Sequence, residues 1–270
     1  MRKVINKYKV LFAIFRTHRN PFLLVLEHFK LLKKKEMIIR MKNGLKFKVR
    51  SRSDDTRIIR EIFVHNVYNN ILSSDKISNH GGTVGVDIGA HIGLFSVLAA
   101  AKLKHVRIFS FEPLPENYRL LQENICINNL KGKVFPICKA ISVKAGESLI
   151  LRTSYENMSG ASMYLRNDHS FPGTKIKVET ITLSDIFRIY NISHIDFLKA
   201  DCEGCEYEIF YATPTEYLRK ISEMIIEYHA HTCYSDWYSE KEKLKNFLCK
   251  LGFLVEEFIN YIYAKQKHYQ

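Results

Sequence analysis

The sequence predicts an α/β protein whose core is a doubly wound, mostly parallel sheet with helices on both faces. Two observations indicate this fold class. From about residue 83 onward, short apolar runs typical of strands alternate with runs of helical periodicity, and a glycine-rich turn joins the first strand to its helix. A chain of 270 residues with 46% hydrophobic content is also long enough for one large α/β domain with appendages.

The alternating pattern gives the core elements in chain order. We expect strands at 83–87, 106–111, 134–138, 195–200 and 223–228, and helices at 92–103, 115–128 and 240–251. Between the third and fourth strands, β-like runs at 147–152 and 175–181 flank a long loop. Alternating runs at 253–258 and 261–264 finish the chain. Ligands of such sheets bind at the carboxyl ends of the strands.

The N-terminal part has a different pattern. Apolar residues at 4–15 recur at helical spacing, and Asn20-Pro21 predicts the N-cap and first turn of a second helix that extends to Leu32. Residues 1–60 carry eighteen Lys and Arg against four acids, whereas the other 210 residues have a net charge of −1. Two basic amphipathic helices suit an anionic membrane surface. Equally, their apolar faces could pack on the domain with the lysines facing water.

A hairpin and a helix follow this arm. Asn43-Gly44 stands between two alternating runs and predicts a β-hairpin with a two-residue turn. A helical pattern then covers 55–71. We therefore divide the chain into a basic amphipathic helical arm (1–36), a β-hairpin and helix (37–80) and the α/β domain (81–270).

Cysteine usage and hydropathy bear on location. The six cysteines lack the spacing of small disulfide-rich secreted domains, so we expect reduced thiols. No stretch approaches the roughly 20 apolar residues of a membrane span. The basic start is not followed by a cleavage pattern. These features predict a cytoplasmic protein, with the arm as the part suited to peripheral contact with the inner membrane face.

The turn after the first strand, VGVDIGAHIGLFS (84–96), carries the first chemical signal. Gly85, Gly89 and Gly93 are four residues apart, unlike the G-x-G-x-x-G spacing of dinucleotide sites. Asp87 would repel a pyrophosphate, which disfavours an NAD-dependent oxidoreductase. A carboxylate at that place suits a ligand with a cationic amine and a sulfonium. The alternative is an ordinary strand–turn–helix connection.

Glu112 ends the next strand, nineteen residues after Gly93. An acid at that position can accept hydrogen bonds from ribose hydroxyls. Asp-x-Gly-x-x-x-Gly followed by a strand that ends in Glu is the pattern of class I, Rossmann-like methyltransferases that use S-adenosylmethionine. The residues expected at the cofactor are Tyr68, Asp87, Gly89, Ala90, His91, Gly93, Glu112, Pro113 and Asp201.

Two later strands end in ionisable side chains. The segments are HIDFLKADCEGCEYEIF (194–210) and MIIEYH (224–229). The ionisable residues at their ends are Lys199, Asp201, Glu203, Glu206, Glu227 and His229.

Together with VDIGAHIGLFS and FSFEPLPENYRLLQENICINN, these segments resemble the FkbM family of methyltransferases over roughly residues 55–255. The K-x-D-x-E-G-x-E arrangement is the most specific part. The resemblance implies a class I fold, S-adenosylmethionine as cofactor, and methylation of hydroxyl groups in glycans, glycolipids or polyketides. The chain departs from the family pattern at His91, where asparagine is usual, and at Cys202 and Cys205, where small apolar residues are usual.

Methyl transfer to a hydroxyl needs in-line positioning and a base within hydrogen-bond reach. His229 suits the base by its ordinary pKa, and Asp201 by its position in the family pattern. A core or solvent-facing role for His229 is the alternative. The expected catalytic set is Asp201, Glu203, Glu227 and His229. Tyr68 and the Ser159–Ser162 loop are candidates for covering cofactor and substrate.

A metal site is a rival interpretation that we do not predict. Cys202 and Cys205 have the spacing of half a zinc site, completed by His229, His231 and Cys233. Cysteines that replace small apolar residues are more often buried hydrophobes. Oxygen ligands for a divalent cation would be Asp201, Glu203 and Glu227.

Other functions lack their motifs. Base-directed methyltransferases of this fold carry Asn/Asp-Pro-Pro-aromatic where this chain has Asp201-Cys-Glu-Gly, so we do not expect a nucleic-acid substrate. A membrane-surface or nucleic-acid-binding module without catalysis would have lost the cofactor loop, which is intact. The expected partners are S-adenosylmethionine, a hydroxyl-bearing acceptor and, through residues 1–35, a membrane.

Overall fold

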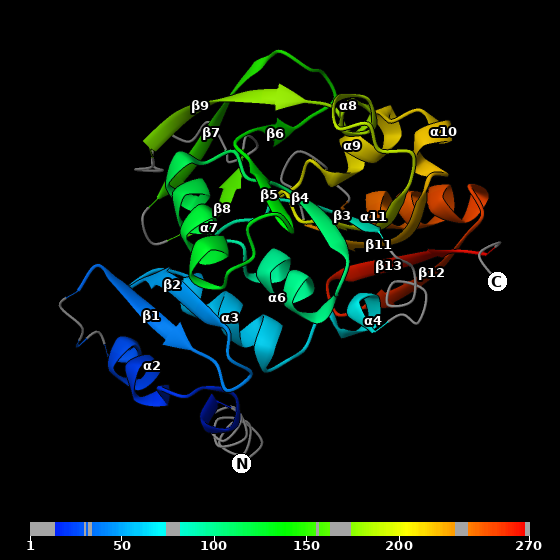
Figure 1. Ribbon diagram of the computed structural model, residues 1–270. Coiled ribbons are helices and arrows are strands. Elements are labelled where there is room, and N and C mark those ends of the chain that lie inside the picture. The colour runs from blue at the N-terminus through cyan, green and yellow to red at the C-terminus, as the bar shows by residue number, and fades with distance from the viewer. Residues whose placement is uncertain are drawn as a thin grey trace.

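The computed structural model describes residues 14–29, 31, 34–73, 82–154, 157–162, 174–229 and 237–267. Its centre is a seven-stranded sheet in the order β12-β13-β11-β10-β3-β4-β5 (Figure 1). The strands are β3 (Thr83–Ile88), β4 (Val106–Phe111), β5 (Val134–Ile137), β10 (Ile195–Ala200), β11 (Ile221–Glu227), β12 (Phe253–Phe258) and β13 (Tyr261–Gln266).

The sheet confirms the predicted fold class. β11, β10, β3, β4 and β5 pair in parallel. At one edge β13 runs in the opposite direction and pairs antiparallel with both β11 and β12. The chain leaves β3 toward β4 and β5 and later returns to the other side of β3 as β10. Ligands of open α/β sheets bind where the strand order reverses in this way.

Helices cover both faces of the sheet. One apolar core contains α6 (Leu94–Lys102) and α7 (Pro115–Ile127), and the other contains α8 (Leu183–Ile189) and α11 (Trp237–Lys250). The adjacent residues Phe197 and Leu198 of β10 lie in different cores, Phe197 in the first and Leu198 in the second. The short helices α8, α9 (Glu206–Ala212) and α10 (Thr215–Leu218) have no counterpart among the predicted elements.

The hairpin is confirmed, but its turn differs from the prediction. β1 (Glu36–Arg40) pairs with β2 (Lys46–Arg50) in antiparallel register. The Gly44 N–H donates to the Met41 carbonyl at 3.2 Å, and the Met41 N–H donates to the Leu45 carbonyl at 2.8 Å. Gly44 has a φ of 94°. This is a longer hairpin loop with a left-handed glycine, not a two-residue turn.

The helix predicted over 55–71 is wrong in its continuity. It divides into α3 (Asp55–Phe63) and α4 (Asn69–Leu72). Asn66 lies between them with a φ of 52°. Left-handed residues of this kind end helices, and asparagine tolerates that conformation.

The arm packs partly on the domain. Of the first predicted helix, residues 1–13 lie outside the described residues. The second, α2 (Pro21–His28), ends before Leu32 because the Leu31 N–H donates back to the Leu26 carbonyl at 2.9 Å. Asn20 makes no side-chain cap. Its amide instead bonds the backbone of β1, at Ile38 and Arg40.

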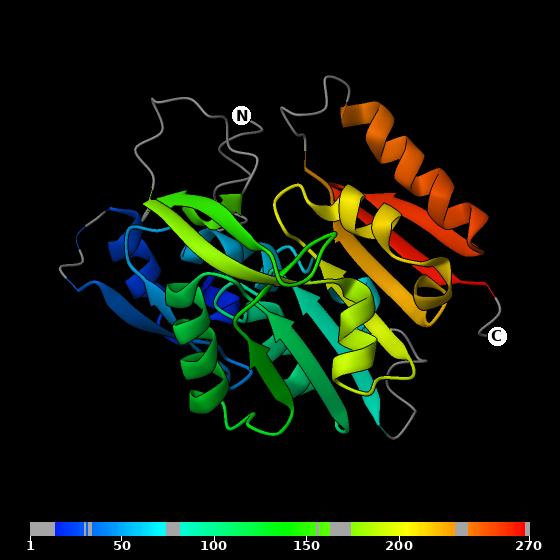
Figure 2. The same cartoon turned by 90° about the horizontal axis from the view of Figure 1, so that it is seen from above.

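A second sheet is inserted between β5 and β10. Its strands are β6 (Ala140–Ile141), β7 (Ser148–Ser154), β8 (Asn157–Ser162) and β9 (Thr174–Ile181), in the order β6-β9-β7-β8. Residues 159–162 therefore belong to a strand, and the loop predicted there is wrong. Figure 2 shows this green sheet crossing near the arrowheads of the central strands.

Gly85 allows β3 and β10 to pair closely, which gives a test of the packing. A Cβ at Gly85 would lie 2.2 Å from Cζ of Phe197, its register partner on β10. We expect Gly85→Ala to lower the free energy of unfolding by about 1–3 kcal/mol, because the buried ring has to move. Adding Phe197→Leu should recover part of this loss in denaturant unfolding. Strictly additive effects of the two substitutions would contradict this explanation.

Candidate active site

A cavity lies at the carboxyl ends of β3, β4, β10 and β11, with α3 and β7 as further walls. Nine of the residues expected from the sequence line it: Tyr68, Gly89, Ala90, His91, Glu112, Pro113, Asp201, Glu203 and Glu227. Asp87, Gly93 and His229 are not among its lining residues. Leu149 and Leu151 of β7 add an apolar wall that the sequence analysis did not assign to the site.

Gly89 holds the ends of two strands against each other. Its φ is +73°, and a Cβ there would lie 1.8 Å from the backbone oxygen of Asp201. The Gly89 and Ala90 N–H groups both donate to the carbonyl of Phe111, at 3.0 and 2.9 Å. The turn thus needs a residue without a side chain because three strand ends meet there.

Asp87 lies beneath the glycine turn, in the core and not at the cavity. It is fully buried, and its Oδ2 accepts a hydrogen bond from Ser96 Oγ at 2.6 Å. Lys199 Nζ lies 3.2 Å from Asp87 Oδ1, 3.3 Å from Asp201 Oδ2 and 2.8 Å from the Gly89 carbonyl. Burial alone would lower the pKa of Lys199, but the charges of Asp201 and Asp87 outweigh burial and raise it. Lys199 therefore joins the two carboxylates as a fixed cation.

Glu112 is buried at the end of β4. It accepts hydrogen bonds from His91 N at 2.8 Å, Leu114 N at 2.9 Å and Asn117 Nδ2 at 3.2 Å. Burial raises the pKa of Glu112, and these donors oppose the rise. A carboxylate accepts about four hydrogen bonds, so capacity for a ligand hydroxyl remains.

Glu206 is a residue that the sequence motif contained but to which we assigned no role. It is fully buried, and its Oε1 lies 2.9 Å from His229 Nδ1. His229 Nε2 consequently faces the other acids, 3.6 Å from Glu203 Oε2 and 3.8 Å from Asp201 Oδ1. Glu203 reaches this position with a left-handed φ of 55°. One histidine is thus surrounded by three carboxylates.

These contacts separate the pKa values of the cluster. Burial would lower the pKa of His229, but the hydrogen bond with Glu206 and the nearby carboxylates raise it to about 10. Burial raises the pKa of Glu203 to about 7, and burial together with Asp201 raises that of Glu227 to about 8. Burial opposes ionisation of Asp201, yet Lys199 and His229 lower its pKa. Near neutrality His229 therefore carries a proton, and Glu203 and Glu227 are the better matched proton acceptors.

Metal ligation has two geometric candidates in the described part of the chain. The ligand atoms of Asp201, Glu227 and His229 lie within 4.8 Å of one another, as do those of Asp54, Asp55 and His91. Neither group contains a cysteine, and His231 and Cys233 lie outside the described residues. Burial raises the pKa of Cys202 well above its ordinary value, which disfavours a thiolate ligand.

The model of the Methyltransferase FkbM domain matches residues 87–255. This chain belongs to the FkbM methyltransferase family.

Named relatives match along much of this FkbM-family chain. It is 29% identical over 199 residues to Methyltransferase sdnD of Sordaria araneosa, and this match covers 63% of this chain and 73% of that protein. It is 23% identical over 216 residues to the 31-O-demethyl-FK506 methyltransferase FkbM of Streptomyces tacrolimicus, covering 71% of this chain and 81% of that protein. Methyltransferase FkbM from Methylobacillus flagellatus KT superposes with a TM-score of 0.43 at 16% identity, over 68% of this chain and 43% of that one.

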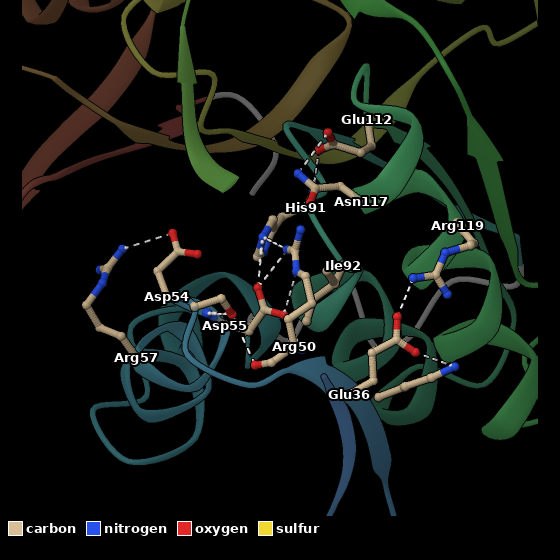
Figure 3. A network of polar contacts seen from close by, with 12 residues as sticks. Glu36, Arg50, Asp54, Asp55, Arg57, His91, Ile92, Glu112, Asn117 and Arg119 are labelled. Carbon is tan, nitrogen blue, oxygen red and sulfur yellow. Dashed lines mark hydrogen bonds and ion pairs between the residues drawn. The ribbon is translucent and has the colours of Figure 1, made fainter. Parts of the chain in front are cut away.

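His91 stands where the FkbM family usually has asparagine, and its ring contacts the hairpin and α3. His91 has a left-handed φ of 52° and joins a buried network with Arg50 of β2 and Asp55 of α3 (Figure 3). Arg50 and Asp55 lie in a stretch without a recognisable motif, so the sequence analysis missed both. Only the fold brings them to the glycine loop.

The raised pKa values of Glu203 and Glu227 give a prediction about pH. As pH rises from about 6 to about 9, both groups ionise in the folded protein and the cavity becomes more negative. We expect the affinity for S-adenosylmethionine, whose sulfur is cationic, to rise about tenfold relative to the uncharged-sulfur product S-adenosylhomocysteine. Calorimetric titrations of both ligands across this range measure the ratio. Glu227→Gln should flatten the dependence, and a pH-independent ratio in the unaltered protein would contradict it.

Proposed function

We propose that this methyltransferase transfers a methyl group from S-adenosylmethionine to a hydroxyl oxygen, with a sugar of a glycan or glycolipid as the acceptor class. The observation that carries the proposal is the charge of the cavity. Asp201, Glu203 and Glu227 line it, and Lys199 is the buried cation among them. Five acids and three Lys or Arg residues line the cavity in all. A cationic cofactor beside Glu203 and Glu227 favours their ionised form, and carboxylate oxygens accept hydrogen bonds from an acceptor rich in hydroxyls.

Different lining residues suit the ribose, the base and the sulfonium of S-adenosylmethionine. Glu112 retains acceptor capacity for the ribose, while Leu114, Ile141 and Leu149 offer apolar surface for the base. The acids at the ends of β10 and β11 lie where the sulfonium would be neutralised. The glycine turn gives room for close approach of the backbone to the ligand.

When bound, S-adenosylmethionine supplies an activated methyl group on a sulfonium. The chain's own residues then have to position the acceptor oxygen and receive its proton. We assign the proton to Glu227 or Glu203, whose pKa values lie near neutrality and which line the cavity. Asp201 stays ionised beside Lys199, and Glu206 holds the His229 imidazolium so that it stabilises the ionised carboxylates. In the balanced reaction the methyl–sulfur bond would break as the carbon–oxygen bond forms, the bonding pair would stay on sulfur in the departing neutral thioether, and the hydroxyl proton would go to the carboxylate.

The name of one relative, the 31-O-demethyl-FK506 methyltransferase, refers to a methylated oxygen and supports the choice of a hydroxyl acceptor. A protein that keeps the fold but only binds a membrane surface or nucleic acid is the alternative. Direct binding of the cofactor separates the two.

Substitutions of Glu112, the proposed partner of the ribose, and of Asp201, at the end of β10, should have different effects. Glu112→Ala should weaken S-adenosylmethionine binding at least tenfold in calorimetry, because charge-assisted hydrogen bonds contribute about 1.5–3 kcal/mol each. Asp201→Asn should retain the fold and reduce turnover on a hydroxyl acceptor more than a hundredfold. NAD serves as the control ligand and should not bind. Full affinity in Glu112→Ala, or full turnover in Asp201→Asn together with Glu203→Gln, would sink the assignment.

We further propose that the arm attaches the enzyme peripherally to an anionic membrane, where a lipid-linked acceptor would be within reach. One face of α2 packs inward through Leu24, while Phe22 is 68% exposed, and Phe29 and Leu31 are each 65% exposed. Residues 1–35 carry ten basic groups and one acid. Within the described residues, no helix is both long and apolar enough to span a bilayer.

Vesicle binding tests this surface. Phe22→Ser with Phe29→Ser should reduce cosedimentation with anionic vesicles at least tenfold, because inserted aromatic area is lost. Leu254→Ser, at a side chain 54% exposed on β12, is the matched control. Substitution is preferable to truncation because Ile14 and Leu24 belong to the same core as the hairpin. Equal sedimentation of all three proteins would end the membrane proposal.

A further inference from the structure

The wall of the cavity that α3 forms has no task in the proposed function. Arg57, Ile58, Glu61 and Ile62 of this helix line the cavity. Residues three or four positions apart lie on one face of a helix, so a single face of α3 is turned toward the cavity. The match to the family domain begins at residue 87, after α3. This wall therefore belongs to a part of the chain that the shared domain does not include.

Two of these side chains form an ion pair that stays accessible. Arg57 Nη1 lies 2.6 Å from Glu61 Oε1, one turn further along the helix, and the two side chains are 52% and 39% exposed. Figure 3 shows the guanidinium of Arg57 next to Asp54, apart from the buried Arg50–Asp55 pair. Ion pairs this exposed contribute little to stability. A guanidinium has five N–H donors and a carboxylate accepts about four hydrogen bonds, so both partners keep capacity for a ligand.

The pair lies close to the two carboxylates that we propose as proton acceptors. Burial would lower the pKa of Arg57, but nearby carboxylates, Glu61 first and Glu227 among them, raise it. Burial raises the pKa of Glu203 to about 7, and the positive charge of Arg57 is among those that oppose the rise. Salt screens charges that are more than about 10 Å apart, so these effects require proximity. An acceptor whose hydroxyl reaches Glu203 or Glu227 therefore has its neighbouring atoms near α3.

The chemistry of this wall suits an acceptor with several hydroxyls. A hydroxyl both donates and accepts hydrogen bonds, whereas a guanidinium only donates and a carboxylate only accepts. A guanidinium and a carboxylate side by side can thus bind two neighbouring hydroxyls, one through each partner. Ile58 and Ile62 on the same face offer apolar contact for the C–H side of a sugar ring. An apolar molecule with one hydroxyl would cover the charged pair without replacing its hydrogen bonds to water, which is unfavourable.

We infer that Arg57 and Glu61 bind neighbouring hydroxyls of the acceptor, so that α3 selects a polyhydroxylated sugar over an alcohol with a single hydroxyl. The inference rests on the proposed methylation of a hydroxyl and deepens it. Neither residue takes part in the proton transfer. Their loss should therefore weaken binding of the acceptor and leave binding of the cofactor unchanged.

An array of immobilised glycans tests this binding directly. The full chain, saturated with S-adenosylhomocysteine, should be retained by at least one glycan, whose soluble form is then titrated in a calorimeter. Glu61→Gln keeps the size of the side chain and should bind this glycan at least tenfold more weakly, because a charge-assisted hydrogen bond is lost. Arg57→Lys keeps the charge but loses the planar fork, and should have a similar effect. In methyl-transfer assays KM for the glycan should rise by the same factor in both variants, with kcat within twofold.

Glu123→Gln is the matched control. Arg119 Nη1 lies 2.6 Å from Glu123 Oε1 on α7, with the same spacing along the helix and with 47% and 34% exposure, but neither residue lines the cavity. This variant should leave the affinities for the glycan and for S-adenosylmethionine unchanged.

Three results would overturn the inference: no glycan retained by the unaltered protein, full glycan affinity in Glu61→Gln, or weaker binding of S-adenosylmethionine in either α3 variant. The last result would assign the pair to the cofactor. The proposed function fails separately. If the unaltered protein retains a glycan through Glu61 but does not bind S-adenosylmethionine, the sugar site stands and the methyl transfer does not.

Discussion

The contact of β3 with β10 at Gly89 is the constraint on which the rest of the site depends. The carbonyl of Asp201 occupies the space that any side chain at position 89 would need. This approach places Lys199 between Asp87 and Asp201, so that one buried cation is shared by carboxylates from two strands. A single buried charge would be costly, but the shared arrangement gives each of the three groups a neighbour of opposite charge. The position of Asp201 at the cavity is thus fixed from behind by the core.

The acids beyond Asp201 are not equivalent, because each has different neighbours. Lys199 and His229 keep Asp201 ionised, whereas burial keeps protons on Glu203 and Glu227 to higher pH. Environments that separate the pKa values of adjacent groups are how one site holds both a fixed charge and a proton acceptor. His229 is held as a cation by Glu206, the first residue of α9, which begins two residues after Gly204.

The N-terminal segment is continuous with the catalytic core. Phe47 of β2 and Ile59 of α3 share one apolar cluster with Leu94 of α6 and Leu121 of α7. Asn124 of α7 pairs with the backbone of Lys48 through both its amide groups. Arg50 and Asp55 belong to this segment and contact His91. The position of His91 in the glycine loop therefore depends on how the N-terminal segment packs.

The sequence by itself determined the sheet, the order of its strands along the chain and the residues that follow each strand, because periodicity and glycine spacing are local properties. It also determined the family, since each of the motif segments is a short run of neighbouring residues and they follow one another in a fixed order along the chain. Only the tertiary structure decided that Asp87 acts through Lys199, that His229 is a cation beside Glu206, and that Arg50 and Asp55 reach the glycine loop. Each of these depends on charged groups that are distant in the chain and lie within about 4 Å of one another in the fold. The Coulomb interaction at such distances shifts the pKa of a side chain away from its ordinary value. A sequence pattern does not give the distance between side chains that are far apart in the chain.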